Sequence, residues 1–162
     1  MLSPDYYYRG VHDIDLEALR ERGIDTLLVD LDNTLLPRDT SEVPEALRTW
    51  ASDAASAGFR VCLVSNNWHE RVHGVAEELG VELVAKALKP LPFAFLRALR
   101  LVGSVRSRAA VVGDQMFTDV LGGRWLGMVT VLVTPLSESD LPHTLMLRRI
   151  ERMLLADRQP VP

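Results

Sequence analysis

Asp30-Leu31-Asp32-Asn33-Thr34-Leu35 follows directly on the apolar run Thr26-Leu27-Leu28-Val29. The run predicts a buried strand, and the carboxyl ends of parallel strands border the crevice in which open α/β sheets bind ligands. If the chain stays extended, Asp30 and Asp32 point the same way, so they could share a divalent cation or divide the roles of nucleophile and acid/base. The competing interpretation is a polar strand exit with an Asx-type turn at Asp32-Asn33.

The rest of the chain alternates between apolar runs and amphipathic segments. Strands are predicted at 25–31, 59–64, 81–84, 109–112 and 129–133, and helices at 16–22, 44–57, 70–79, 92–102, 117–126 and 141–156. Continuous apolar strands separated by helices indicate a sheet that is covered on both faces. The sequence therefore predicts an α/β fold with three layers and a doubly wound sheet of five parallel strands. We expect one domain over 1–162, with an N-terminal extension at 1–24 and a C-terminal helix at about 141–156.

Composition narrows the class of protein. The chain has 18 basic and 22 acidic residues, a net charge of −4, which argues against a nucleic-acid partner. The single cysteine, Cys62, cannot form an internal disulfide and fits a small buried apolar residue in a reducing cytoplasm. No stretch approaches the roughly 20 apolar residues of a membrane span, and the N-terminus lacks the apolar core of a signal peptide. We expect a cytoplasmic protein, either soluble or peripheral on the inner face of the membrane.

Polar residues also follow the second and third predicted strands. Ser65-Asn66-Asn67 places a hydroxyl and backbone N–H groups where an anion would dock, although these residues are also typical of an ordinary helix start. Lys89 lies in the next loop, where Pro90 and Pro92 fix the entry to a helix and aim the side chain. A single lysine in such a loop is commonly just solvated. Lys86 competes for the same role, but the prolines favour Lys89.

The fourth predicted strand ends in Gly113-Asp114-Gln115-Met116-Phe117-Thr118-Asp119. Gly113 permits a tight turn, and Asp114 and Asp119 flank the start of the next helix. Asp119 by itself could equally be a first-turn carboxylate that complements the helix dipole. Each of these signals is weak alone, but all four come in a fixed order at the ends of successive strands.

Together the motifs D-x-D-x-T, S, K-P and G-D-x-x-x-x-D resemble those of the haloacid dehalogenase-like (HAD) phosphatase superfamily. The resemblance extends from about residue 25 to residue 133. Three further segments resemble the YqeG-type branch: Leu2-Ser3-Pro4-Asp5-Tyr6, Val64-Ser65-Asn66-Asn67 and Thr118-Asp119-Val120-Leu121-Gly122-Gly123. The resemblance implies a phosphomonoester hydrolase that needs Mg²⁺.

The resemblance also implies a role for each motif residue. Asp30 would attack phosphorus and form an aspartyl-phosphate, and Asp32 would protonate the leaving oxygen and then activate water. Mg²⁺ would be held by Asp30, the main-chain oxygen of Asp32, and Asp114, with water completing its shell. The phosphoryl oxygens would be bound by Ser65, Asn66, Lys89 and the main-chain amides near Leu31 and Asn33. Thr34, Gly113 and Asp119 would support these groups, with Asp119 one shell outside the ion.

His69-Glu70-Arg71-Val72-His73 points to a different chemistry. It matches H-E-x-x-H, with which zinc peptidases bind their metal and place a glutamate base. No clear third ligand follows, and the inward face of the predicted helix should cover the sheet. Surface histidines beside that face are the simpler interpretation, and zinc peptidase activity is kept as a distant alternative.

The short intervals between motifs leave no room for a lid domain. Only 32 residues separate Asp32 from Ser65 and 23 separate Ser65 from Lys89, and a crossover helix uses most of each interval. Members of this superfamily often carry a cap that closes over small substrates. An open site suits a phosphate on a large molecule, or a partner subunit, such as a second copy of the chain, that covers it.

The YqeG-type resemblance implies phosphatidylglycerophosphate as the substrate, and the alternative is a cytosolic phosphatase for a soluble or macromolecular phosphate. Two segments are compatible with contact to a membrane. Tyr6-Tyr7-Tyr8 could lie at a membrane interface or pack on the edge of the domain. The last predicted helix, with Arg148, Arg149 and Arg152, could bind a lipid surface or simply pack on the sheet.

Overall fold

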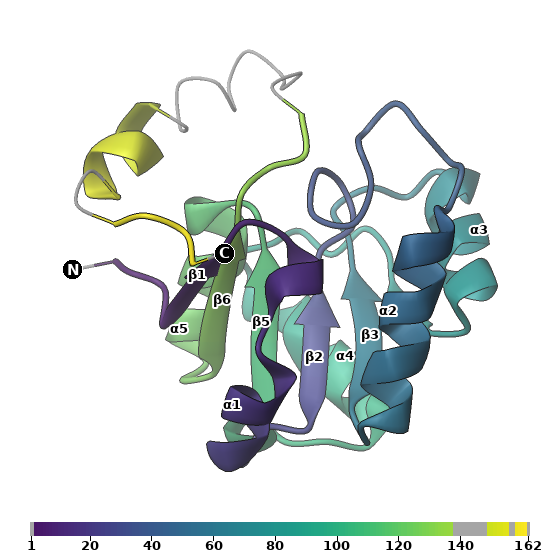
Figure 1. Cartoon of the computed structure of the whole chain (residues 1–162), viewed down its shortest axis with the longest axis horizontal. Coiled ribbons are helices and arrows are strands. Elements are labelled where there is room, and N and C mark those ends of the chain that lie inside the picture. The colour runs from purple at the N-terminus through teal and green to yellow at the C-terminus, as the bar shows by residue number, and fades with distance from the viewer. Residues whose placement is uncertain (1, 138–148, 156–157, 162) are drawn as a thin grey trace.

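The computed structural model describes residues 2–137, 149–155 and 158–161. A sheet of six parallel strands forms its centre (Figure 1). The strands are β1 (Tyr6–Tyr8), β2 (Thr26–Val29), β3 (Arg60–Val64), β4 (Glu82–Val84), β5 (Ala109–Gly113) and β6 (Val129–Val133). The helices are α1 (Leu16–Glu21), α2 (Glu45–Ser56), α3 (Glu70–Leu79), α4 (Pro92–Val102) and α5 (Leu121–Trp125), with short turns η1 (Val11–Asp13), η2 (Arg106–Arg108) and η3 (Met116–Val120). Residues 149–154 form one further helical segment.

The strand order, β1-β6-β5-β2-β3-β4, decides where a ligand can bind. The chain runs from β2 outward through β3 and β4, and then crosses back to β5 on the other side of β2. The carboxyl ends of β2 and β5 therefore border the switch point at which doubly wound sheets leave a crevice. Val29 of β2 pairs with Val112 of β5, so Asp30 and Asp114 leave neighbouring strands at the same edge.

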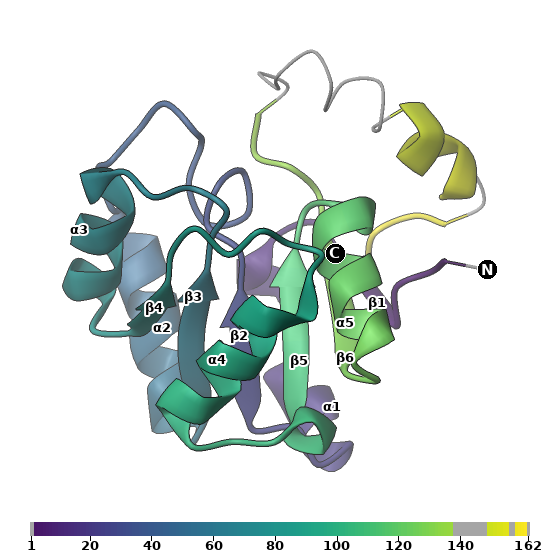
Figure 2. The ribbon, with the colours of Figure 1, turned by 180° about the vertical axis from the view of Figure 1, so that it is seen from behind.

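Helices cover both faces of the sheet, which confirms the predicted three-layer, doubly wound arrangement. α1, α2 and α3 pack on one face, where Leu47, Trp50 and Val72 bury against strand residues such as Leu27 and Leu63 (Figure 1). α4 and α5 lie on the other face, seen from behind in Figure 2. Phe95 of α4 packs there among Leu28, Cys62 and Val111.

The sixth strand is the main departure from the predicted sheet. Tyr6, Tyr7 and Tyr8, expected within an N-terminal extension, form β1 and pair in parallel with Val131, Leu132 and Val133 of β6. The Tyr7 carbonyl also accepts the N–H of Val161 at 2.8 Å, so β1 lies between β6 and the end of the chain. The tyrosine cluster thus packs on the edge of the domain, one of its two predicted settings.

The predicted helix over 117–126 also differs in form. Its first turn is the π-helical η3, and only Leu121–Trp125 is α-helical. A π turn is wider than an α turn and is frequent at functional sites. Here it carries Asp119, which is almost fully buried.

The predicted C-terminal helix lies partly outside the described residues, which omit 138–148 and 156–157. Its described part docks through Glu151, whose buried carboxylate accepts the N–H of Met116 at 2.8 Å. No helix in the described part of the chain has the length and apolar character needed to cross a bilayer.

Candidate active site

Three aspartates meet at the carboxyl edge of the sheet. Asp30 follows β2, Asp114 follows β5, and Asp119 extends from η3. One carboxylate oxygen from each lies within 4.8 Å of the others, and all three residues are buried. Buried carboxylates repel one another unless a cation compensates them.

Lys89 supplies part of that compensation. Its Nζ lies 2.7 Å from Asp30 Oδ1 and 2.7 Å from Asp119 Oδ1, and its side chain is only 2% exposed. Burial alone would lower the pKa of the Lys89 ammonium group, but the charges of Asp119 and Asp30 outweigh it and raise that pKa above its ordinary value. Burial raises the pKa of Asp119 to about 6, against the opposing pull of Lys89. With one ammonium group among three carboxylates, the cluster has an excess of acidic groups over basic ones.

This donor set fits Mg²⁺. Hard divalent cations prefer carboxylate and carbonyl oxygens, and the cluster offers carboxylate oxygens from Asp30, Asp114 and Asp119. Asp119 is closer than the resemblance implied, because it belongs to the same cluster. Its other oxygen accepts the N–H of Gln115 at 3.2 Å.

Thr34 and Gly113, the predicted supporting residues, lie against the aspartates. The Thr34 hydroxyl lies 3.1 Å from Asp30 Oδ2 and 3.2 Å from Asp114 Oδ1, so it bridges the first and fourth motifs. Gly113 lies directly under Asp119: a Cβ atom at Gly113 would come within 2.2 Å of the Asp119 Cγ. A side chain at Gly113 would therefore push that carboxylate out of the cluster.

The second and third motifs are bonded to each other. Asn66 Oδ1 accepts the Lys89 N–H at 2.7 Å, and Asn66 Nδ2 donates to the Lys89 carbonyl at 3.4 Å. Ser65 is fully buried, and its hydroxyl accepts the N–H of Asn67 at 3.1 Å. Lys86 is exposed, so the structure brings Lys89 and not Lys86 to the aspartates.

The resemblance implied that the main-chain amide of Asn33 contacts the phosphate, but in the structure this residue is bonded within its own loop. Its backbone is left-handed (φ 61°), and its N–H donates to the Leu36 carbonyl at 2.7 Å. Its Oδ1 accepts the Ser137 hydroxyl at 2.7 Å. The main-chain amide is thus already bonded within the loop, and Asn33 shapes the loop that carries Asp30 and Asp32.

Arg71 is the site residue that the sequence analysis missed. Its Nη1 lies 2.6 Å from Asp32 Oδ1, its Nη2 donates to the Pro37 carbonyl at 2.7 Å, and its Nε donates to the Thr40 carbonyl. Arg71 therefore fixes the Asp32 side chain and the loop that follows it. The only signal was its place within His69-Glu70-Arg71-Val72-His73, a motif that pointed to zinc instead.

That motif does not form a metal site in the described residues. His69 precedes α3 as its N-cap residue, and His69, Glu70 and His73 are all exposed. Val72, Val75 and Ala76 make the buried face of α3. Across the described ranges, the cluster of metal-ligand side chains is the aspartate group, and neither histidine belongs to it.

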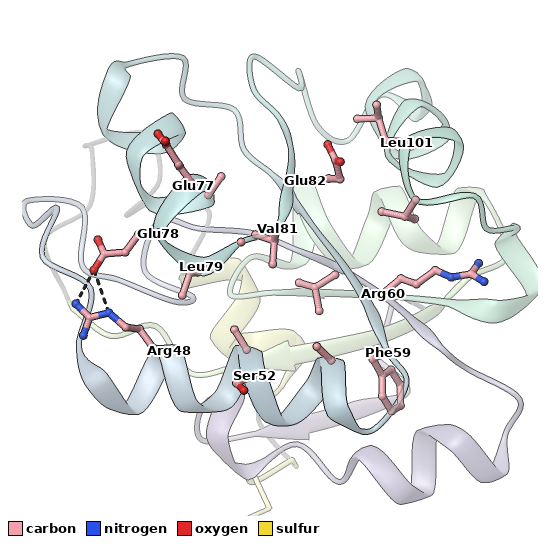
Figure 3. Close-up of a pocket in the computed structure, with 16 residues that line it drawn as sticks. Arg48, Ser52, Phe59, Arg60, Glu77, Glu78, Leu79, Val81, Glu82 and Leu101 are labelled. Atoms are coloured by element: carbon pink, nitrogen blue, oxygen red, sulfur yellow. Dashed lines mark hydrogen bonds and ion pairs between the residues drawn. The ribbon is translucent and has the colours of Figure 1, made fainter.

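Two cavities lie at opposite edges of the sheet. One, of about 400 Å³, borders Asp114 and is closed on its other side by residues 151–155; Tyr7, Leu132 and Thr134 also line it. A wider one, of about 840 Å³, lies near the amino ends of β3 and β4, where Arg48 of α2 pairs with Glu78 of α3 (Figure 3). Its walls hold Arg60, Glu82 and Leu101 but none of the motif residues.

Comparison with known proteins agrees with this geometry. Residues 86–138 match the family model described as HAD-hydrolase-like. The chain is 38% identical over 153 residues to the Bacillus subtilis protein named "Probable phosphatase YqeG", covering 94% of this chain and 89% of that protein. It is 26% identical to the Arabidopsis thaliana chloroplastic/mitochondrial phosphatidylglycerophosphate phosphatase 1, covering 94% of this chain but only 46% of that protein.

Solved structures share the fold. The cobalt-bound form of the deoxy-D-mannose-octulosonate 8-phosphate phosphatase of Haemophilus influenzae aligns with a TM-score of 0.53 at 13% identity, covering 83% of this chain and 89% of the other. The fold, the sequence and the motif residues therefore define a HAD-type phosphatase. The chain belongs to the YqeG family within that superfamily.

Proposed function

We propose that this phosphatase is a Mg²⁺-dependent phosphomonoester hydrolase in which Asp30 is the nucleophile. The observation that carries the proposal is the setting of the Asp30 carboxylate at the switch point of the sheet. Lys89 holds one of its oxygens at 2.7 Å and Thr34 lies 3.1 Å from the other. Such fixed contacts orient the carboxylate for in-line attack, and phosphoryl transfer depends mainly on positioning and electrostatics.

The chain's own residues account for both halves of the reaction. Asp30 attacks phosphorus, the bond to the leaving oxygen breaks, and Asp32 gives that oxygen a proton. Asp32 then takes a proton from water, which attacks the aspartyl-phosphate and releases inorganic phosphate. Arg71 fixes the position of Asp32 through the contact at 2.6 Å.

Electrostatic stabilisation comes from Lys89 and would also come from Mg²⁺ when it is bound. Mg²⁺ would be held by Asp30, the Asp32 main-chain oxygen and Asp114, and when bound it supplies positive charge to the phosphoryl oxygens. Ser65 and Lys89 would bind the phosphoryl oxygens, with Asn66 holding the Lys89 loop in place. Asp119 holds the Lys89 ammonium group beside Asp30.

For the substrate we propose phosphatidylglycerophosphate, which would be dephosphorylated to phosphatidylglycerol by a cytoplasmic enzyme at the membrane surface. The name of the Arabidopsis relative and the absence of a cap domain in the described residues support this choice. Arg149 and Arg152 are exposed on the C-terminal segment, and each could gain about 1 kcal/mol near anionic headgroups. A soluble or macromolecular phosphate is the alternative.

The reaction is tested with Asp30→Asn. The wild type should release phosphate from p-nitrophenyl phosphate when Mg²⁺ is present, and Asp30→Asn should abolish this with the circular dichroism spectrum unchanged. Wild-type activity in the variant would remove Asp30 from the mechanism. The substrate is tested by comparing kcat/KM on phosphatidylglycerophosphate with kcat/KM on sugar and nucleotide phosphates; a higher value on a soluble phosphate would favour the alternative.

A further inference from the structure

Four large apolar side chains are exposed on the two loops that meet at Lys89. They are Trp68 (63% exposed), Leu88 (61%), Leu91 (44%) and Phe93 (74%), and we call them the apolar rim. Single exposed apolar residues are ordinary on protein surfaces, but a group of them beside a functional site indicates a contact surface. None of the four takes part in the proposed chemistry.

Hydrogen bonds join the two loops that carry the apolar rim. Trp68 lies in the loop after β3 and the other three lie between β4 and the first turn of α4. The Lys86 N–H donates to the Asn67 carbonyl at 3.1 Å, and the Asn66 side chain holds the Lys89 main chain. The Leu91 N–H donates to the Leu88 carbonyl at 3.0 Å. The two loops that carry the rim are therefore tied together, and they also deliver Lys89 to the aspartates.

Further apolar exposure lies on the C-terminal segment. Ile150, Met153 and Leu154 are exposed on residues 149–154, and Glu151 of that segment is bonded to η3 at the carboxyl edge. Figure 1 shows this segment and the loops after β2, β3 and β6 on the same side of the sheet, toward which the strand arrows point. In contrast, Val105 and Trp125 are exposed near the amino ends of the strands.

Charge at the rim suits an anionic surface. Lys86 lies in the rim loop, and Arg97 lies one helical turn beyond Phe93; both side chains are exposed. Trp68 packs against His69, with ring centroids 5.4 Å apart and the ring planes tilted by 32°. Aromatic residues flanked by basic ones are typical of segments that lie in the headgroup region of a bilayer.

We propose that the apolar rim inserts into the surface of a bilayer that contains anionic phospholipid. The inference rests on the proposed lipid substrate and adds the face by which the enzyme reaches it. Docked by this face, the open site would lie against the headgroups, so a phosphate on a lipid could meet Asp30 without leaving the membrane. The enzyme would need no cap, because the bilayer itself would exclude water from the entrance.

The test compares two double variants. Trp68→Ser with Phe93→Ser removes the two aromatic rings of the rim, and Val105→Ser with Trp125→Ser removes comparable exposed groups from the opposite edge. Vesicles of phosphatidylcholine and phosphatidylglycerol report binding by co-sedimentation. The rim variant loses two aromatic side chains that would be buried in the bilayer, so its vesicle binding should weaken by about tenfold or more. The control variant should change little. Equal binding by both variants would overturn the proposal.

Three substrates separate this proposal from the proposed function. The rim variant should keep wild-type kcat/KM on p-nitrophenyl phosphate and on short-chain phosphatidylglycerophosphate dispersed as monomers, yet lose activity on the same headgroup in vesicles. If the wild type does not hydrolyse the monomeric lipid, the proposed substrate is wrong. The vesicle-binding measurement then still tests whether the apolar rim contacts the bilayer. If the rim variant keeps full activity on vesicles, the rim proposal is wrong and the substrate stands.

Tryptophan fluorescence gives an independent measurement. In a Trp125→Phe variant, Trp50 is buried and Trp68 is the exposed reporter. Adding vesicles should shift the emission to shorter wavelength, and brominated lipid chains should quench it. An unchanged spectrum in the presence of saturating vesicles would place Trp68 outside the bilayer and contradict the proposal.

Discussion

Lys89 is an ammonium group buried between two carboxylates, a setting that costs a great deal of solvation free energy unless the partners are close. The contacts at 2.7 Å to Asp30 and Asp119 offset that cost and raise the pKa of Lys89 above its ordinary value. The lysine is therefore charged at neutral pH. A fixed charge at this position is available to phosphoryl oxygens without reorganisation.

Replacing this lysine should cost far more than replacing its neighbour. Lys89→Ala should lower kcat on p-nitrophenyl phosphate by about a hundredfold or more, the range for loss of one preorganised electrostatic group. Lys86→Ala is the matched control, since its side chain is exposed in the same loop, and it should change kcat much less. Equal losses from the two variants would contradict the assignment of Lys89.

Cys62 should be chemically silent in the folded protein. Burial raises the pKa of its thiol to about 12, so the reactive thiolate is scarce at neutral pH, and the side chain is fully buried in β3. A thiol reagent such as dithiobis-nitrobenzoate should react slowly with native protein and at once after unfolding in guanidinium. Fast reaction of the native protein at pH 8 would show that the core around β3 opens readily.

At the scale of elements, α5 approaches the sheet closely because of two glycines. A Cβ atom at Gly122 would lie 2.5 Å from the Phe95 ring, and one at Gly123 would lie 2.7 Å from Thr130 Cγ2. Neither position therefore has room for a side chain. The same approach holds η3, and with it Asp119, against the end of β5.

Two alanine substitutions in helices should therefore have opposite effects. Gly123→Ala should destabilise the fold by about 1–2 kcal/mol, since overpacking exceeds the gain in helix propensity. Gly74→Ala in α3 meets nothing within 4 Å and should stabilise by about 0.5–1 kcal/mol. Urea unfolding measures both free energies. A Gly123→Ala protein as stable as the wild type would mean that α5 can move away from β6 at little cost.

At the scale of the whole molecule, folding brings together segments that are far apart in the chain. Asp30, Lys89 and Asp114 reach one point because the parallel strands β4, β3, β2 and β5 are neighbours in the sheet and end at the same edge. The clustered carboxylates exist only in the folded state. An ion that they bind must therefore stabilise that state over the unfolded chain.

Mg²⁺ should accordingly raise the melting temperature. At a concentration of about 100 times its Kd, binding contributes roughly 2.7 kcal/mol, which corresponds to about 5–10 °C for a protein of this size. Asp114→Asn should abolish most of this shift while leaving the metal-free protein folded. Thermal melts with Mg²⁺ and with a chelator measure it. A shift of the same size in the variant would exclude Asp114 as a ligand.

Much of the fold and of the candidate site could be predicted from local patterns. The runs around Leu28, Cys62 and Val111 are continuous and apolar because each strand is covered on both faces, so their order identified a doubly wound parallel sheet. The motif residues stand at strand ends, where the chain leaves the core and polar groups can converge. The sequence by itself therefore determined the α/β class and the convergence of Asp30, Lys89 and Asp114.

Only the tertiary structure decided features that depend on pairing between distant segments. Tyr6–Tyr8 joins β6 across more than a hundred residues, and no local apolar run marks it as a strand. Arg71 reaches Asp32 from α3, and the N–H of Asn33 is bonded within its own loop. No sequence pattern predicted either contact. The apolar rim likewise needs two loops bonded together. Local propensity depends on neighbours in the chain. These contacts depend instead on the strand order of the sheet, which decides which loops lie side by side.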